Sequence, residues 1–358
     1  RKILKIKHPD RGQKNITYSR KGVPMSCLYI TENGSKVAVK GGHFIVECQD
    51  GSERLVPKET LESIVIFGNV YLTVPCIKEC LERGIAVSMF STKGKYFGRI
   101  ESTNHVNAKR LKQQVYLSDQ EEMRVQFSKK IILNKIHNQR VLLTRYQRST
   151  GKNIQENIQA IKIHENKISH CTNIEQIMGY EGNAARQYFA ALSKMIKEDF
   201  KFSGRNKRPP RDAFNSMISL GYTILMYEIM GEIENRGITP YIGFMHKDIE
   251  RHPTLASDLL EEWRAVIVDA TVMSMIQGNE ISINEFSKDE ETGAVIISKN
   301  GVNLFIKKLE KKLQSNMNYL EYLEHPVSFR RAIWWQVSKI VKCIDNGNFD
   351  DYMPIRIR

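Results

Sequence analysis

Residues 209–264 read PPRDAFNSMISLGYTILMYEIMGEIENRGITPYIGFMHKDIERHPTLASDLLEEWR. Apolar residues recur through the first half at helical spacing, and they predict a helix near 212–235. His246 ends the short apolar segment PYIGFMH, and Asp258 opens the acidic cluster DLLEE twelve residues later. Far upstream, a further carboxylate, Glu181, lies in GYEGNAARQYF. One imidazole with two or more carboxylates is a ligand set for a hard or borderline divalent cation, such as Mg²⁺ or Mn²⁺.

The helical pattern extends on both sides of this stretch, from about Asn107 onwards. Apolar residues between Phe127 and Leu143 form one face of a helix expected over Val115–Tyr146, with basic residues elsewhere. An interruption at Lys288–Ser298 contains a turn signal and a short apolar run, which indicate a small hairpin. Further helices are expected near 153–166, 181–198, 255–276, 302–315 and 328–345.

The region before residue 107 is β-rich. A helix is expected within it over Pro75–Arg83, with Gly84 as its C-cap. Short alternating or β-branched runs, separated by turn signals, predict strands over Cys27–Thr31, Lys36–Lys40, His43–Cys48, Ser63–Phe67, Ala86–Phe90 and Tyr96–Ile100. The sequence therefore predicts an α+β protein in which a β domain, residues 25–106, precedes an all-α domain, residues 107–358.

The chain is strongly basic. Its 358 residues include 54 Lys and Arg against 40 Asp and Glu, a formal net charge of +14. Such an excess favours a polyanionic partner or a membrane surface. Residues 1–24 alone hold eight Lys or Arg and one Asp, and Met25-Ser26-Cys27 is typical of a natural start. We expect residues 1–24 to be a solvated basic tail, an upstream linker or the remnant of a fused segment, with no part in a core.

Several classes of protein are excluded by patterns that the sequence lacks. No apolar run is long enough to span a bilayer and no signal peptide is recognisable, which predicts a soluble, cytoplasmic protein. The six cysteines are scattered without a paired C-x-x-C, so free buried thiols are expected rather than disulfides or a zinc site. The P-loop pattern G-x-x-x-x-G-K-[ST] is missing, which argues against an ATP-driven reaction.

Each candidate ligand also has an ordinary structural explanation. Glu181 either extends an apolar helix face and needs a cation there, or only favours the positive end of the helix dipole. A lone histidine after an apolar run, such as His246, is usually a satisfied core residue. On a helix, Glu261 shares a side with Asp258, away from the apolar face, whereas Glu262 lies nearer that face. A solvated acidic face gives the same pattern, so from the residues alone these alternatives stay open.

Several segments together resemble the CRISPR adaptation integrase family, the DNA-inserting endonuclease subunit of the spacer-acquisition complex. The resemblance rests on YEGNAARQYF around Glu181, on the motif P-x-x-G-x-x-H that ends at His246, and on an Asp with a second acid three residues later, which begins at Asp258. The segments FSTKGKYFGRI, NSMISLGYTIL and SFRRAIWWQ also fit, and the likeness covers most of the chain from Met25 to about Cys343. It implies an N-terminal β-sandwich-like domain that dimerises, followed by a helical catalytic domain.

The resemblance also implies a role for each candidate residue. The catalytic metal ligands, for Mg²⁺ or Mn²⁺, would be Glu181, His246 and Glu261, although many relatives have Asp where this chain has Glu261. The residues that support the metal ligands would be Asp258, Asn215 and Tyr222. Contacts with DNA phosphates would come from Arg186, Arg205, Lys207, Arg208 and Arg211. Without the resemblance, a charged loop such as KFSGRNKRPPRD would be expected only to face solvent.

The activity that the resemblance implies is DNA strand joining in CRISPR antiviral defence. The 3′-hydroxyl ends of a short duplex would be joined to target DNA by metal-assisted transesterification. With water as the nucleophile, the same site would act as a hydrolytic DNA nuclease, which is the second interpretation. A non-catalytic nucleic-acid-binding scaffold is the third. The implied partners are double-stranded DNA (the prespacer and the CRISPR repeat and leader), a second copy of the chain, and a small ferredoxin-like companion subunit.

Overall fold

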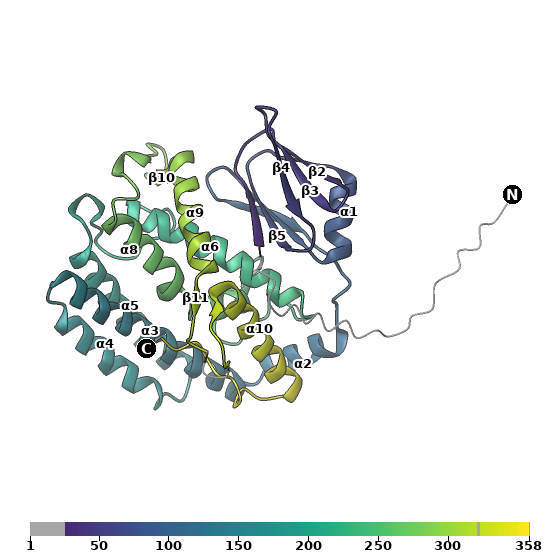
Figure 1. Ribbon diagram of the computed structural model, residues 1–358. Coiled ribbons are helices and arrows are strands. Elements are labelled where there is room, and N and C mark those ends of the chain that lie inside the picture. Colours follow the sequence, from purple (N-terminus) through teal and green to yellow (C-terminus); the bar gives the residue numbers. More distant parts are fainter. Residues whose placement is uncertain (1–25, 321–322, 358) are drawn as a thin grey trace.

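The computed structural model describes residues 26–320 and 323–357 (Figure 1). Strands β1 to β8 all lie before residue 101, and long helices follow from residue 108. The expected α+β class, with an N-terminal β region followed by a helical region, is therefore confirmed. The expectations for residues 1–24 lie outside the described residues. Within the described ranges, no helix combines the length and the apolar character needed to cross a bilayer.

The β region consists of two four-stranded sheets, with the strand orders β1-β5-β7-β8 and β4-β3-β2-β6. In the first sheet, β5 is parallel to both β1 and β7, and β7 is antiparallel to β8. The strands are β1 (Ser26–Ile30), β2 (Lys36–Lys40), β3 (His43–Glu47), β4 (Glu53–Pro57), β5 (Leu61–Phe67), β6 (Tyr71–Leu72), β7 (Ala86–Phe90) and β8 (Tyr96–Ile100). The six predicted strands are all present. The sequence did not predict β4, an edge strand without apolar alternation, or β6, which has two residues.

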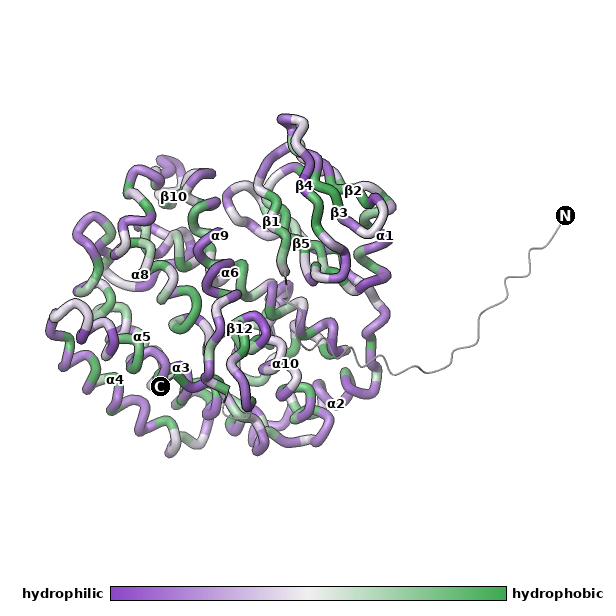
Figure 2. Tube along the Cα trace, in the orientation of Figure 1, coloured by the Kyte–Doolittle hydropathy of each residue, from purple (hydrophilic) through white to green (hydrophobic). Residues whose placement is uncertain are grey.

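The two sheets and helix α1 (Val74–Arg83) enclose one core. Phe44 and Ile64, from different sheets, are buried in a single cluster with Cys76 of α1. Thr73 caps α1, because its side chain accepts a hydrogen bond from the backbone N–H of Cys76. Gly84 ends α1 in the left-handed conformation, with φ 69°, as the sequence predicts. In Figure 2, hydrophobic green runs along β3 and β5, whereas much of the outer helix α4 is purple.

The helical region surrounds a second, larger core. Its helices are α2 (Ala108–Ser118), α3 (Glu121–Thr150), α4 (Gln155–Ile168), α5 (Ile174–Met195), α6 (Ala213–Glu234), α7 (Thr254–Leu260), α8 (Ala270–Gln277), α9 (Lys299–Gln314) and α10 (Phe329–Asn346). The expected small hairpin is formed by β9 (Phe286–Lys288) and β10 (Val295–Ile297), and a further short pair by β11 (Asn316–Met317) and β12 (Val327–Ser328).

Two predicted helices have different boundaries in the structure. The helix expected over Val115–Tyr146 is divided into α2 and α3, which Asp119 and Gln120 separate. The helix expected from residue 181 begins earlier, where the side chain of Asn173 accepts a hydrogen bond from the backbone N–H of Gln176. Helix α5 continues through its glycines because it packs against both α3 and α4, and this tertiary contact outweighs their low helix propensity.

The helix expected over 255–276 is interrupted. Its first part, α7, ends at Leu260, and a π-helical turn at Arg264–Asp269 separates it from α8. Such turns have one extra residue between hydrogen-bonded groups and occur frequently at functional sites. The acidic cluster therefore lies where the helix changes its winding.

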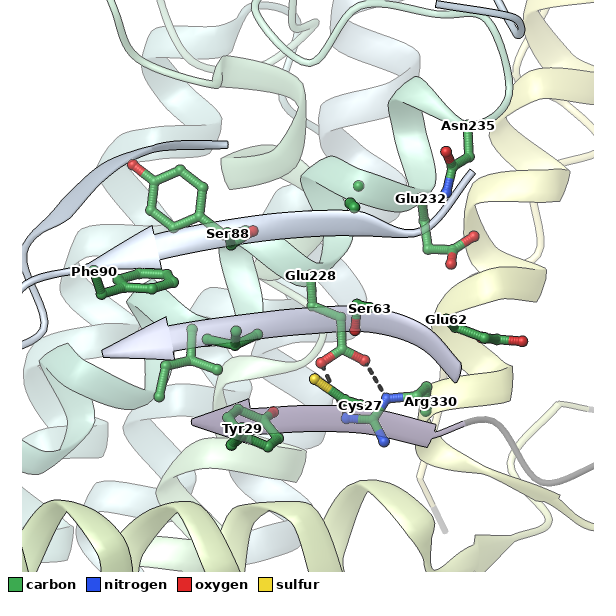
Figure 3. Close-up of a pocket in the computed structure, with 15 residues that line it drawn as sticks. Cys27, Tyr29, Glu62, Ser63, Ser88, Phe90, Glu228, Glu232, Asn235 and Arg330 are labelled. Carbon is green, nitrogen blue, oxygen red and sulfur yellow. Dashed lines mark hydrogen bonds and ion pairs between the residues drawn. The ribbon is translucent and has the colours of Figure 1, made fainter. Parts of the chain in front are cut away.

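The β region is joined to the helical region by contacts with α6 and α10. The ring of Phe90, in β7, packs edge to face against Tyr227 of α6, with centroids 5.6 Å apart. Beside it, Arg330 of α10 pairs with Glu228 of α6 at 2.7 Å and with Glu310 of α9 at 2.7 Å. Figure 3 shows Glu228 and Arg330 next to Cys27 of the first sheet. These residues help to line a small cavity, with a volume of about 40 Å³. This ion-pair network ties three helices together directly under the sheet.

The segment after α10 returns to the centre of the helical region. Tyr352 donates a hydrogen bond from its hydroxyl to Glu262 at 2.8 Å, and Gln336 donates to the same carboxyl at 2.7 Å. Further along, Asn138 of α3 donates to the carbonyl of Ile355 at 3.0 Å. Burial raises the pKa of Glu262 to about 8 even though Tyr352 and Gln336 donate hydrogen bonds to it.

This raised pKa predicts how stability depends on pH. The folded protein keeps a proton on Glu262 that the unfolded chain releases near pH ~4.3. The resulting stability is complete below that pH and is lost as the pH rises through about 8. We expect Glu262→Gln, which cannot ionise, to show a smaller fall in the free energy of unfolding between about pH 6 and pH 9, measured by urea denaturation. Glu175→Gln, an exposed substitution, is the control, and equal pH profiles for Glu262→Gln and the wild type would contradict the prediction.

Candidate active site

Three segments bring the predicted metal ligands together. Glu181 lies in α5, His246 lies in the loop after α6, and Glu261 follows α7 directly. The Nε2 atom of His246 is 3.9 Å from Oε1 of Glu261. The ammonium of Lys135, in α3, is 2.5 Å from Oε1 of Glu181 and 2.6 Å from Oε2 of Glu261. Glu181 and Glu261, which are 80 positions apart in the sequence, therefore share the ammonium of Lys135, and His246 lies beside Glu261.

Glu181 is not in the first turn of its helix. Because α5 begins at Ile174, the carboxylate lies in the interior of the helix, beyond the reach of the positive end of the dipole. Its side chain is 14% exposed and contacts the ammonium of Lys135. The alternative in which Glu181 only complements a helix terminus is therefore wrong.

Asp258 holds the histidine loop in place. Its fully buried carboxylate accepts hydrogen bonds from the backbone N–H groups of Phe244 at 2.8 Å, Met245 at 3.0 Å and His246 at 3.2 Å. The same carboxylate lies 2.6 Å from Nδ1 of the His246 ring. Because Nδ1 is engaged by Asp258, the ring nitrogen that faces Glu261 is Nε2.

Steric contacts require glycine at position 243, within PYIGFMH. A Cβ atom on Gly243 would lie 2.7 Å from Oδ2 of Asp258 and 2.6 Å from the methyl carbon of Thr254. Neither neighbour has room to move, because Asp258 and Thr254 are both fully buried. The backbone of the loop can approach the carboxylate only with glycine at this position.

The acidic cluster is buried rather than solvated. Asp258, Glu261 and Glu262 are each 3% exposed or less, so the alternative of a solvated acidic face is wrong. Glu261 is paired with Arg264 at 3.0 Å as well as with Lys135. The other two carboxylates point elsewhere, Asp258 into the histidine loop and Glu262 toward the C-terminal segment. Only tertiary packing against the histidine loop, α3 and the C-terminal segment distinguishes the three acids.

The charges at the site shift its pKa values in opposite directions. Burial alone would raise the pKa of Glu261, but the neighbouring Arg264 and Lys135 lower it below its usual value. Burial lowers the pKa of His246, yet the hydrogen bond and charge of Asp258, together with Glu261, raise it overall. Glu261 therefore remains an anion, which is the form that binds a cation.

A large cavity opens beside these residues, with a volume of about 1120 Å³. Glu181, His246 and Glu261 all line it. The predicted phosphate-binding residues that also line it are Arg186, Arg205, Lys207 and Arg208. Arg211 is outside the lining, and its guanidinium lies against Gly293 in the β9–β10 hairpin. The cavity is therefore basic at its walls and acidic where the three candidate ligands meet.

Asn215 connects the basic loop to α6. Its side-chain oxygen accepts hydrogen bonds from the guanidinium of Arg205 at 2.9 Å and from the backbone N–H of Asn206 at 3.1 Å. Its amide donates to the carbonyl of Gly204 at 2.9 Å and to Asp212 at 2.8 Å. These four hydrogen bonds fix the loop that carries Arg205.

Tyr222 contacts the site through arginines. The guanidinium carbons of Arg205 and Arg264 lie 5.5 Å and 5.1 Å from the centre of its ring. Its hydroxyl donates to Asp269 at 2.5 Å, and Tyr188 donates to the same carboxyl at 2.8 Å. Burial raises the pKa of Asp269 to about 6 despite these two hydrogen bonds. Tyr222 thus helps to orient Arg264, which in turn pairs with Glu261.

Sequence reasoning missed Lys135 and Arg264. Both contact Glu261. Lys135 lies outside every quoted segment, and Arg264, although it ends the stretch 209–264, was given no role. A signal was present for Lys135, because it lies on the buried face of α3 together with Asn138 and Gln139. Polar residues at apolar positions of a long helix require buried partners, and such partners are often functional.

The residues present fit a divalent cation. Across the described ranges, no three His, Cys, Asp or Glu side chains are close enough to form a metal cluster as they stand. A cation is already present between two of the candidate ligands, because the ammonium of Lys135 lies between the carboxylates of Glu181 and Glu261. Two carboxylates and the free Nε2 of His246 are an oxygen and nitrogen donor set suited to Mg²⁺ or Mn²⁺.

Comparisons with known proteins find a matching family and similar individual proteins. A model of the family described as "CRISPR associated protein Cas1" matches residues 28–311. The "CRISPR-associated endonuclease Cas1" of Mycobacterium tuberculosis is 36% identical over 324 residues, which cover 90% of this chain and 95% of that protein.

Solved structures share the fold. A "casposase bound to integration product" has a TM-score of 0.79 at 21% identity, covering 93% of this chain and 96% of that chain. A chain of a "Cas6-RT-Cas1--Cas2 complex" has a TM-score of 0.78 at 23% identity. The alignment covers 94% of this chain but 36% of that longer one. At these identities the likeness shows the fold alone.

The contacts of Asp258 predict a cost in stability when its charge is removed. Asp258→Asn replaces one acceptor oxygen by an amide that cannot accept the N–H groups of the histidine loop. We expect the free energy of unfolding to fall by about 2–3 kcal/mol, the scale of lost hydrogen bonds to a charged group, in urea denaturation. Ser257→Ala, at the neighbouring position, removes one neutral hydrogen bond with His252 and should cost about 1 kcal/mol. Equal losses for the two variants would show that Asp258 does not hold the loop.

Proposed function

The chain belongs to the Cas1 family of CRISPR-associated proteins, and on that premise we propose that it joins short DNA duplexes to target DNA during CRISPR adaptation. The observation that carries the proposal is the convergence of Glu181, His246 and Glu261 beside a large basic cavity. The cavity offers cationic side chains to phosphates, and the three ligands offer a place for a divalent cation next to them. The name of the mycobacterial relative, an endonuclease, agrees with phosphodiester chemistry.

The proposed reaction is a transesterification. The 3′-oxygen of the incoming duplex attacks a phosphorus of the target strand and forms a new P–O bond. The bond from that phosphorus to the 3′-oxygen of the target breaks, and the proton of the attacking hydroxyl reaches the leaving oxygen through solvent. The number of phosphodiester bonds is unchanged, so ATP is not consumed. DNA supplies the nucleophile, so a covalent intermediate with the protein is unnecessary.

The residues of the chain have separate roles in this reaction. Glu181, His246 and Glu261 would hold Mg²⁺ or Mn²⁺, which supplies polarisation of the scissile phosphate when bound. Asp258 fixes the imidazole with Nε2 toward Glu261. Arg264 pairs with Glu261 and lines the cavity, where its guanidinium can stabilise negative charge that develops on phosphate oxygens.

A hydrolytic nuclease is the second candidate function, since the endonuclease name of the mycobacterial relative favours cleavage. Water would replace the 3′-hydroxyl as nucleophile, with the same residues around it. A joining assay with supercoiled target and a 3′-hydroxyl or 3′-blocked duplex separates the two functions, because only joining requires the free hydroxyl. The third interpretation is a nucleic-acid-binding scaffold without catalysis. Loss of activity in Glu181→Ala, without loss of DNA binding, would separate both enzymatic functions from it.

The assembly proposed for this activity has two kinds of protein contact. We propose that the β region pairs two copies of the chain, and that such dimers bind a small ferredoxin-like companion subunit. The solved "Cas6-RT-Cas1--Cas2 complex" contains a chain that shares this fold, which supports a companion protein. Double-stranded DNA, as prespacer and as CRISPR repeat and leader, would occupy the basic cavity.

Substitutions in the acidic cluster distinguish the ligand from its neighbours. Glu261→Gln keeps the shape of the side chain but removes the charge that holds a divalent ion, so we expect strand joining to fall by at least about a hundredfold. Glu262→Gln should retain joining, because Glu262 contacts Tyr352 and Gln336 rather than the cavity. Asp258→Asn should lie between them, since it misplaces His246 without removing a ligand. The measurement is the joining rate against Mn²⁺ concentration.

Each variant in this series needs its own check of folding and DNA binding. Glu261→Gln should bind duplex DNA as well as the wild type or better, because a negative charge near phosphate has been removed. If Glu262→Gln is inactive and Glu261→Gln joins DNA normally, the assignment of the third ligand is incorrect.

The basic walls of the cavity predict a salt-dependent affinity for DNA. Replacing Arg205, Lys207 and Arg208 by Gln should weaken duplex binding and reduce the slope of log affinity against log salt by ~1 for each phosphate that the protein no longer neutralises. Arg211→Gln is the matched comparison from the same loop, and we expect a smaller effect because Arg211 is outside the cavity lining. Fluorescence anisotropy at several salt concentrations measures both. An unchanged slope in the triple variant would mean that the loop is merely solvated.

A further inference from the structure

Lys135 is a buried cation at the centre of the candidate site. Its side chain is 7% exposed, and it extends from α3 between α5 and the end of α7. The ammonium contacts one oxygen of Glu181 and one oxygen of Glu261, at 2.5 Å and 2.6 Å. For Oε2 of Glu261, it is the one ionic partner among the described residues. Lys135 therefore links two carboxylates from different segments, one in α5 and one directly after α7.

The charges of this group are already balanced without a metal ion. The two carboxylates of Glu181 and Glu261 face two cations, Lys135 and Arg264. A divalent ion that bound the same carboxylates would be repelled by the ammonium at short range in a poorly solvated site. The ammonium and the divalent ion therefore compete for the same oxygens. Binding of the ion requires the ammonium to leave.

Gln139 offers the displaced ammonium a second position. It follows Lys135 by one helical turn, and side chains at this spacing are neighbours on a helix surface. Its side chain is buried, at 3% exposed, and its Oε1 has no hydrogen-bond partner within the part of the chain that the structure describes. Both residues line the large cavity. A buried acceptor without a donor is costly, and a lysine amine on a flexible stem can supply the donor.

We propose that Lys135 is a positioning residue that occupies the cation place between Glu181 and Glu261, and that it moves to Oε1 of Gln139 when a divalent ion binds. In the first position the ammonium holds the carboxylates together, so the site is assembled before the metal arrives. In the second position it satisfies Gln139 and leaves both carboxylates to the ion. This inference rests on the proposed function, because it assumes that the ion binds at these residues.

The test measures metal binding in the full-length protein without DNA. Isothermal titration with Mn²⁺ gives the affinity, and thermal unfolding in EDTA gives the stability of the metal-free form. Lys135→Met keeps the length of the side chain and removes the charge. We expect it to lower the melting temperature in EDTA and to tighten Mn²⁺ binding by about tenfold or more, the scale on which neighbours of a metal ligand change affinity. Lys162→Met, at an exposed position of α4, should change neither quantity.

A double-mutant cycle tests the second position of the lysine. Gln139→Leu removes the acceptor and should weaken Mn²⁺ binding in the wild-type background. In the Lys135→Met background the same substitution should leave the affinity unchanged, since no ammonium needs to be accommodated. Equal effects of Gln139→Leu in both backgrounds would overturn the proposed movement.

The outcomes separate this inference from the proposed function. If the wild type does not bind Mn²⁺, or if Glu181→Ala binds it equally well, the metal site itself is refuted. If the wild type binds Mn²⁺ through Glu181 but Lys135→Met does not bind it more tightly, the competition is refuted and the metal site stands. If Lys135→Met does not fold, Lys135→Gln replaces it, because glutamine keeps hydrogen-bond donors without the charge. Its Mn²⁺ affinity is then compared with that of the wild type in the same way.

Discussion

A carboxylate removed from water must gain a cation, several N–H or O–H donors, or a proton, and this requirement organises the whole helical region. The segment from Asp258 to Glu262 contains three such groups in five residues. Asp258 is satisfied by backbone amides and an imidazole, and Glu261 by two cationic side chains. Among the described residues, Glu262 accepts hydrogen bonds from neutral donors on one oxygen alone, and its raised pKa favours the protonated form. Identical chemistry at neighbouring positions thus yields three different environments, because three different parts of the chain pack there.

Helix α3 is the element that makes these environments distinct. Along one face it carries Lys135 toward the candidate ligands and Asn138 toward the C-terminal segment. The same helix packs against α4 and α5, which places Glu181 opposite the ammonium. A buried polar face of this kind contributes little to stability by itself, since desolvation offsets most of the attraction between its charges. It fixes instead which side chains meet.

Much of this arrangement follows from the sequence. Most strands could be predicted from short alternating or β-branched runs, as in β2, and most helices from apolar residues that recur with the helical period, as in α10. Features that depend on packing could not be predicted from the sequence. They include the start of α5 and the π-helical turn at Arg264–Asp269. For the site, motif resemblance selected His246 and its carboxylate neighbours. Lys135 lies outside every motif, and its position is decided by how α3 packs.

The close approach of Gly243 to the carboxylate of Asp258 has a consequence for the evolution of this loop. A side chain at position 243 collides with that carboxylate, and loss of the carboxylate leaves three backbone amides without an acceptor. A single substitution at either position, with the other residue unchanged, therefore destabilises the loop. Across homologous chains, the two positions are therefore expected to be retained or replaced as one heritable unit, although fourteen residues separate them.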